Sequence, residues 1–142
     1  TGNKDFEVII IGGSYAGLSA AMALGRSLRN VLIIDSGLPC NRQTPHSHNF
    51  LTQDGEKPVV IAEKAKTQVL SYSTVRFLND LVLSGKRAEN GFVITTQSGQ
   101  EFKAKKLVFA SGKTTVAPNI KARFRITPTT EAGTPESAEV RF

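Results

Sequence analysis

Residues 6–17 read Phe6-Glu7-Val8-Ile9-Ile10-Ile11-Gly12-Gly13-Ser14-Tyr15-Ala16-Gly17. The apolar, β-branched run that ends at Ile11 predicts a strand buried on both faces, as in parallel sheets. Apolar positions recur at helical spacing over residues 15–28, so a helix should follow the glycine turn. Residues 31–35 then predict a second buried strand that ends in a carboxylate. Together these elements predict a βαβ unit with a right-handed crossover, and therefore an α/β fold.

The glycine turn between the strand and the helix has the pattern of a dinucleotide-binding site. Gly12 allows the tight turn, Gly17 lets the helix pack closely on the strand, and the helix N-terminus offers N–H donors to a pyrophosphate. Asp35, eighteen residues after Gly17, would accept hydrogen bonds from ribose hydroxyls. The pattern departs from G-x-G-x-x-G at Ser14, whose side chain crowds the pyrophosphate while its hydroxyl can donate to a phosphate oxygen. A turn that serves packing alone is the alternative.

The rest of the chain predicts one more loop, helix and strand, and then a series of short antiparallel strands. Residues 36–57 are rich in Gly, Pro, Asn and Thr and predict a long loop, followed by a helix over 58–71 and a strand over 74–78. Short alternating segments then predict an antiparallel meander, before a last buried strand; in order they are Leu81–Leu83, Gly91–Thr96, Glu101–Ala104 and the buried Leu107–Ala110. We therefore expect a Rossmann-like parallel sheet with an antiparallel β-meander insertion.

These segments, in this order, resemble the FAD domain of the pyridine nucleotide-disulfide oxidoreductases, and more closely the thioredoxin-reductase-like flavoproteins. The resemblance covers about residues 5–112 and rests on residues 8–21, Asp35-Ser36-Gly37-Leu38-Pro39-Cys40-Asn41-Arg42, His46-Ser47-His48 with Asp54-Gly55, and Leu107-Val108-Phe109-Ala110-Ser111-Gly112. The last stretch looks like the family's second flavin-domain signature, a strand ending in Ala-Thr-Gly, with Ser111 replacing the threonine.

The resemblance implies FAD as the cofactor and a defined set of binding residues. In the family, hydride passes from NAD(P)H to FAD, and electrons then pass to a disulfide, with the cofactor supplying the difficult chemistry. The residues that would contact FAD are Gly12, Gly13, Ser14, Tyr15, Ala16, Gly17, Asp35, Ser36, Asn41, Arg42, His46, His48, Ala110, Ser111 and Gly112. For the two histidines, an exposed loop position without cofactor contact is the alternative.

Two parts of the family pattern are missing from this sequence. The NAD(P)H domain, with its own glycine motif, does not follow Gly112, and the redox C-x-x-C pair is absent because Cys40 is the single cysteine. We expect residues 1–112 to form an FAD-binding domain, truncated relative to the family, and residues 113–142 to form a hairpin or a disordered tail. The expected function is the FAD-binding portion of an NAD(P)H-dependent flavin oxidoreductase, which alone is not a competent disulfide reductase. The alternative is a non-catalytic module that binds ADP or NAD weakly or serves in assembly.

Composition narrows the remaining function classes. The net charge is +6, but the lysines are scattered without interleaved aromatic residues, which argues against nucleic-acid binding. No apolar run is long enough for a bilayer, and a single cysteine without an export signal predicts a cytoplasmic setting. The two histidines do not complete a usual zinc ligand set, so no metal site is predicted. NAD(P)H would be a partner only if a second domain were supplied. The resemblance also implies a Gly-Asp segment that returns to the FAD domain after the NAD(P)H domain; without it, exposed apolar surface would favour a homo-oligomer.

Overall fold

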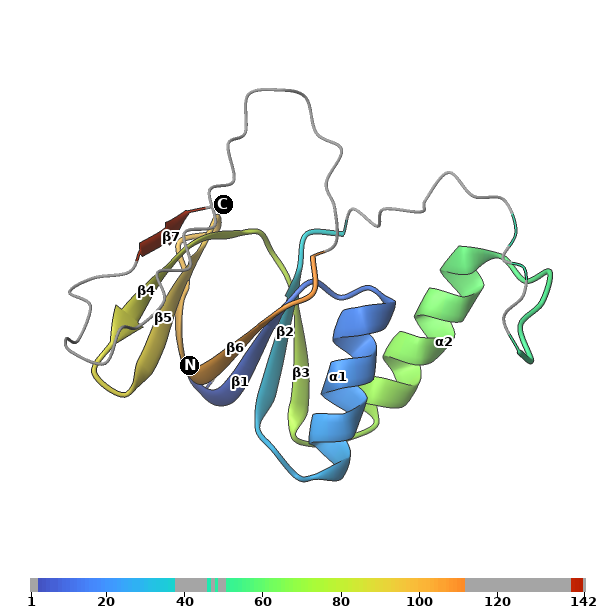
Figure 1. Ribbon diagram of the computed structural model, residues 1–142, viewed down its shortest axis with the longest axis horizontal. Coiled ribbons are helices and arrows are strands. Elements are labelled where there is room, and N and C mark those ends of the chain that lie inside the picture. Colours follow the sequence, from blue (N-terminus) through green and yellow to red (C-terminus); the bar gives the residue numbers. More distant parts are fainter. Residues whose placement is uncertain (1–2, 38–45, 47, 49–50, 112–138, 142) are drawn as a thin grey trace, which may run out of the picture.

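The computed structural model describes residues 3–37, 46, 48, 51–111 and 139–141. In these residues the strands form one sheet in the order β3-β2-β1-β6-β5-β4-β7 (Figure 1). The elements in chain order are β1 Asp5–Ile11, α1 Tyr15–Arg26, β2 Val31–Asp35, α2 Pro58–Leu70, β3 Val75–Asn79, β4 Val82–Ala88, β5 Gly91–Thr96, β6 Glu101–Phe109 and β7 Glu139–Arg141. None of the helices in this described part is long and apolar enough to cross a membrane.

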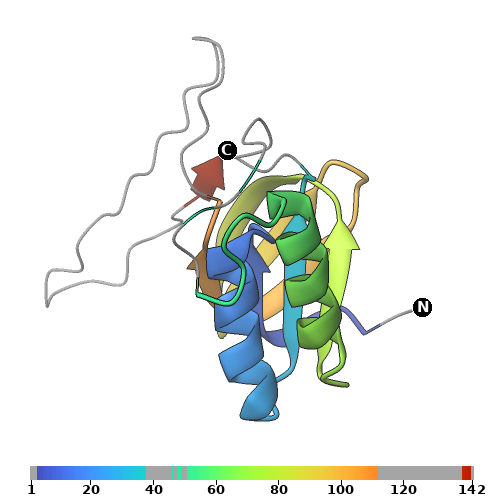
Figure 2. The same cartoon turned by 90° about the vertical axis from the view of Figure 1, so that its right-hand side faces the viewer.

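The parallel half of the sheet confirms the predicted βαβ unit. β1 pairs in parallel with β2 on one side and with β6 on the other, and β2 pairs in parallel with β3. The isoleucines Ile9, Ile10 and Ile33 are fully buried, as expected for strands covered on both faces. Both helices lie on one face of this half, as Figure 2 shows, and pack against a cluster that includes Ile10 and Ile33.

The antiparallel half covers the opposite face of the parallel strands. β4 and β5 form a hairpin, and β5 pairs in antiparallel fashion with the first residues of β6. The cluster on this face joins Ile9 and Leu32 of the parallel strands to Ile94 of β5 and Phe102 of β6. The predicted meander is therefore confirmed, and its function in the fold is to bury the side of the sheet that no helix covers.

One strand of the prediction needs correction. The sequence pattern separated Glu101–Ala104 from Leu107–Ala110, whereas the structure has one continuous strand, β6. β6 pairs with β5 over residues 101–104 and with β1 over residues 103–109, and it changes direction between these parts (Figure 1). The alternation in the first part and the apolar run in the second reflect two different environments along the same strand.

The second correction concerns β4, which continues to Ala88 instead of ending at Leu83. The added residues are mostly polar and show no clear alternation, so the pattern did not predict a strand there. Gly85 is buried in this stretch, and a Cβ on it would lie 2.9 Å from Cδ1 of Ile94. β7 pairs with β4 on its other side. The choice between a hairpin and a disordered tail for residues 113–142 falls mainly outside the described residues.

The carboxylate of Glu7 fixes the connection between α1 and β2. It accepts a hydrogen bond from the Asn30 backbone N–H at 2.9 Å and pairs with Arg29 at 3.2 Å. Hydrogen bonding from Asn30, supported by Arg29, holds the pKa of Glu7 below its ordinary value of 4.5. A lowered folded-state pKa adds stability above pH 4.5, and this stability is lost as the pH falls through the folded-state pKa.

We therefore expect Glu7→Gln to lower the urea midpoint of unfolding at neutral pH, with a difference from the wild type that shrinks as the pH falls toward about 3. The matched control is Glu89→Gln, because Glu89 is exposed in the β4–β5 turn. A Glu7→Gln difference that stays constant across this pH range would contradict the pKa assignment.

Candidate nucleotide-binding site

The glycine turn after β1 is built from two segments that lie far apart in the sequence. Gly12 has a φ of 108° and donates its backbone N–H to the Ile34 carbonyl at 2.9 Å. A Cβ on Gly12 would lie 2.5 Å from the carbonyl oxygen of Ala110 and 2.8 Å from the Ser111 nitrogen. Only glycine fits this position, because both the backbone conformation and the available space exclude a side chain.

Gly17 allows the first turn of α1 to lie directly on the glycine turn. A Cβ on Gly17 would be 1.8 Å from the Gly12 carbonyl oxygen, which is well inside van der Waals contact. The packing function that the sequence pattern assigned to Gly17 is thus explained by a specific backbone oxygen. As a result, the helix axis begins beside the carboxyl ends of β1 and β2.

The N-terminus of α1 is uncapped in the described part of the chain. Ser14 is the N-cap residue, but its side chain makes no capping hydrogen bond, and the first turn contains no acidic residue. Ser14 and Ala16 are exposed, while Tyr15 is half-buried and its hydroxyl donates to the Pro58 carbonyl at 3.3 Å. The first N–H groups of the helix and the Ser14 hydroxyl are therefore available to an anion.

The carboxylate of Asp35 lies against the glycine turn. Its Oδ1 accepts a hydrogen bond from the Gly13 N–H at 3.0 Å, and its Oδ2 accepts one from the Gly37 N–H at 3.2 Å. Each carboxylate oxygen can accept more than one hydrogen bond, so acceptor capacity remains for hydroxyl groups of a ligand. The structure thus brings together the glycine turn, the start of α1 and the acid at the end of β2, in the arrangement that binds dinucleotides in doubly wound sheets.

The chain also resembles known proteins in sequence and in fold. Residues 6–140 match the family described as pyridine nucleotide-disulphide oxidoreductase. The chain belongs to this family. The predicted resemblance to this family is thereby confirmed, and the match extends beyond residue 112, where the resemblance seen in the sequence ended.

The relatives of this oxidoreductase-family chain include thioredoxin reductases. A probable thioredoxin reductase of Arthroderma benhamiae is 36% identical over 119 residues, which are 80% of this chain and 30% of that protein. Thioredoxin reductase sirT of Leptosphaeria maculans is 34% identical, over 82% of this chain and 36% of its own length. The crystal structure of an oxidoreductase from Agrobacterium tumefaciens has a TM-score of 0.75 at 42% identity, over 82% of this chain and 39% of that chain. The chain spans less than half of each and corresponds to part of the FAD-binding domain of a thioredoxin-reductase-like flavoprotein.

The other predicted site residues fall into three groups. Ala110 and Ser111 border the glycine turn, as described above, and Ser36 is exposed directly after Asp35. The remaining described residues are the two histidines, which lie in the loop before α2. Asn41, Arg42 and Gly112, together with Cys40, lie outside the described residues.

The two histidines contact the next turn of their own loop. His46 Nδ1 lies 2.9 Å from the Gly55 carbonyl oxygen, and His48 Nδ1 lies 3.7 Å from Asp54 Oδ1. Both side chains are exposed, and the described residues provide no contact between either histidine and the glycine turn. The predicted flavin contact of these histidines stays a prediction.

Two residues near the site were missed by the sequence analysis. Cε2 of Phe77 in β3 would lie 2.8 Å from a Cβ on Gly13, so the ring forms a wall beside the glycine turn. Lys66 of α2 places its ammonium 3.7 Å from the centre of this ring. The sequence signalled Phe77 only as a strand residue and Lys66 only as a polar helix position, because their proximity depends on the tertiary fold.

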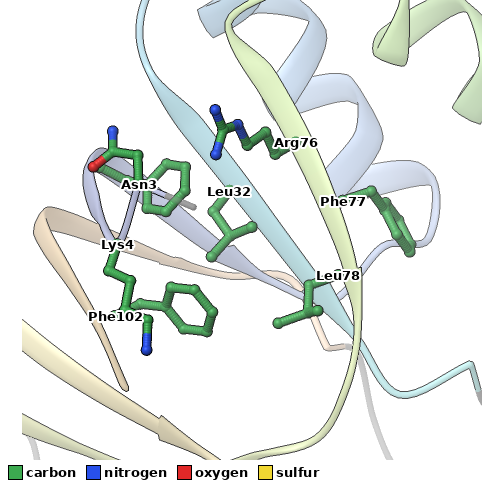
Figure 3. Close-up of a pocket in the computed structure, with 8 residues that line it drawn as sticks. Asn3, Lys4, Leu32, Arg76, Phe77, Leu78 and Phe102 are labelled. Atoms are coloured by element: carbon green, nitrogen blue, oxygen red, sulfur yellow. The ribbon is translucent and has the colours of Figure 1, made fainter. Parts of the chain in front are cut away.

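A hollow of about 190 Å³ lies elsewhere in the fold. It is lined by Asn3, Lys4, Phe6, Leu32, Arg76, Phe77, Leu78 and Phe102 (Figure 3). Figure 3 shows the Phe77 ring directed away from the other lining side chains, and this ring packs with the helix-side cluster. None of the predicted site residues that the structure describes lines the hollow, but Phe77 lines it and also lies beside the glycine turn.

Proposed function

We propose that this chain binds FAD and provides the adenosine and pyrophosphate part of a flavin site. The observation that carries the proposal is the contact of the Asp35 carboxylate with the Gly13 N–H at 3.0 Å, directly beside the uncapped N-terminus of α1. The N–H groups at the start of α1 are suitable donors to a pyrophosphate, and the neighbouring Asp35 carboxylate is a suitable acceptor for the ribose hydroxyls.

The shape of the glycine turn supports the same proposal. The turn has no side chain at Gly12 or Gly13, and a Cβ at either position would meet atoms of the protein within 3 Å. These contacts fix the turn against Ala110, Asp35 and Phe77, so the start of α1 is held where its N–H groups can meet a pyrophosphate. Ser14 is the exception, and we propose that its exposed hydroxyl donates to a phosphate oxygen.

The bound FAD would supply the electron-transfer chemistry, and the residues of this chain would fix its position. Disulfide reduction also needs a pair of cysteines and NAD(P)H, whereas this sequence has Cys40 alone. We therefore propose flavin binding without disulfide reductase activity for the chain by itself. NAD(P)H binding by a further domain, a homo-oligomer and a cytoplasmic location stay predictions from the sequence.

Titration of the purified chain with FAD, followed by visible absorption and flavin fluorescence, tests the proposed function. We expect saturable binding that ADP displaces. Asp35→Ala should weaken binding by roughly 10- to 100-fold, because charge-assisted hydrogen bonds to the ribose are lost. The control is Glu63→Ala, which removes an exposed acid from α2 and should leave the affinity unchanged.

Two outcomes would count against the proposal. Wild-type protein that shows no saturable binding of FAD or ADP would exclude it. Weak binding of ADP or NAD without saturable binding of FAD would instead favour the alternative of a non-catalytic nucleotide-fold module.

A further inference from the structure

Asp80 directly follows β3 and extends the backbone pairing between β3 and β2 to Asp35, the acid predicted to bind the ribose. β2 and β3 pair in register up to Asp35 and Asn79. The next hydrogen bond runs from the Asp80 N–H to the Asp35 carbonyl oxygen at 3.0 Å. The backbone position of Asp35 therefore depends directly on the position of Asp80.

The side chain of Asp80 is itself held by the turn between β5 and β6. Its Oδ1 accepts hydrogen bonds from the backbone N–H groups of Leu81 at 2.8 Å and Ser98 at 3.4 Å. Its Oδ2 accepts a hydrogen bond from the Ser98 hydroxyl. The Ser98 hydroxyl oxygen in turn lies 3.2 Å from Oγ1 of Thr96, a buried polar side chain. We refer to Asp80, Leu81 and Ser98 as the Asp80 junction.

The bend in β6 explains why this turn reaches the site. Because β6 changes direction, the β5–β6 turn lies at the same end of the fold as the carboxyl ends of β2 and β3 (Figure 1). The Gln97 N–H donates to the Leu81 carbonyl at 2.8 Å, which adds a backbone hydrogen bond between the β5–β6 turn and the segment after β3. The Asp80 junction thus joins the antiparallel strands to the carboxyl end of β2, where Asp35 lies.

We propose that Asp80, held by Ser98, is a positioning residue for Asp35 and so for recognition of the nucleotide ribose. This inference rests on the proposed function and extends it to a residue that does not itself touch the ligand. Asp80 sets where the end of β2 lies, and Asp35 makes the contact with the ribose hydroxyls. Hydrogen bonding from Ser98 also keeps the pKa of Asp80 below its ordinary value, so the carboxylate remains ionised and accepts all of these bonds.

The test compares ADP with 2′,3′-dideoxy-ADP, which lacks the ribose hydroxyls, by calorimetric titration of the full chain. Asp80→Ala should weaken ADP binding by about fivefold and dideoxy-ADP binding by less than about 1.5-fold. In an Asp35→Ala background, Asp80→Ala should have no further effect on ADP, because coupled residues are not additive. Asp80→Asn should restore most of the affinity, because its amide oxygen can accept from the Leu81 and Ser98 N–H groups.

A purely structural contribution of Asp80 predicts a different pattern. In that case Asp80→Ala weakens both ligands equally or adds to Asp35→Ala, and either result overturns the inference. Glu89→Ala is the matched control, because it removes an exposed acid from the β4–β5 turn of the same meander. If Asp80→Ala fails to fold, Ser98→Ala provides the same comparison, with an expected loss of about twofold for ADP alone.

The same titrations separate this inference from the proposed function. Wild-type protein that binds neither ADP nor FAD rejects the nucleotide site as a whole. Wild-type protein that binds ADP with selective loss in Asp35→Ala, but without selective loss in Asp80→Ala and Ser98→Ala, keeps the nucleotide site and rejects the positioning by Asp80.

Discussion

Replacing Gly17 by alanine is expected to lower the free energy of unfolding by about 3 kcal/mol and to abolish nucleotide binding. The added methyl group would lie 1.8 Å from the Gly12 carbonyl oxygen, and neither backbone can move without changing the glycine turn. Either α1 shifts away from β1, or the turn opens. Both changes remove the N–H donors of α1 from the place where a pyrophosphate would lie.

Urea unfolding followed by circular dichroism measures the stability, and titration with FAD measures the binding. The control is Ser19→Ala, an exposed change on the same helix, which should alter the stability by less than about 0.5 kcal/mol. If Gly17→Ala were as stable as this control, the close contact between α1 and the glycine turn would be wrong.

Truncation of Ile94 to alanine should lower the free energy of unfolding by about 3 kcal/mol, because the lost methyl groups leave a cavity. Ile94 is fully buried in the cluster that joins the antiparallel layer to the parallel strands. The loss should also reduce the cooperativity of the transition, since this cluster is where the two halves of the sheet share a core.

The comparison for Ile94 is Leu83→Ala in the neighbouring strand β4. Leu83 is 43% exposed, so less apolar area is lost from the interior and the effect should stay below about 1 kcal/mol. Chemical unfolding of both variants gives the difference. Equal losses would mean that the antiparallel layer does not pack on the parallel strands through Ile94.

The elements that the sequence predicted well are those with a strong local pattern. β1 and β2 are apolar runs bounded by turn residues, and α1 has its small residues on the face that meets the sheet. By contrast, the length of β4 depends on pairing with β5 and β7, and polar residues such as Lys86 carry no local sign of that pairing. The continuity of β6 was missed for the same reason, because one strand passes through two environments.

The candidate site shows the same division. Gly12, Gly17 and Asp35 were predicted because their chemistry is tied to a fixed spacing around a strand and a helix. Phe77 and Asp80 were not predicted, because their relation to the site arises from the pairing of β3 with β2 and from the bend of β6. Such residues do not belong to a motif with a fixed sequence spacing, so only the tertiary fold reveals them.

The central position of β6 has a consequence for how the chain folds. β1 pairs with β2 over a short stretch of sequence, but its other neighbour, β6, pairs Phe109 with Ile11, about 100 residues away. Pairings between distant residues form slowly, because a long loop must close first. During synthesis the first strands can collapse with α1 while the second edge of β1 stays open until β6 leaves the ribosome. For that interval the nascent chain presents a bare, apolar strand edge, which is the kind of surface that chaperones cover and that otherwise leads to aggregation.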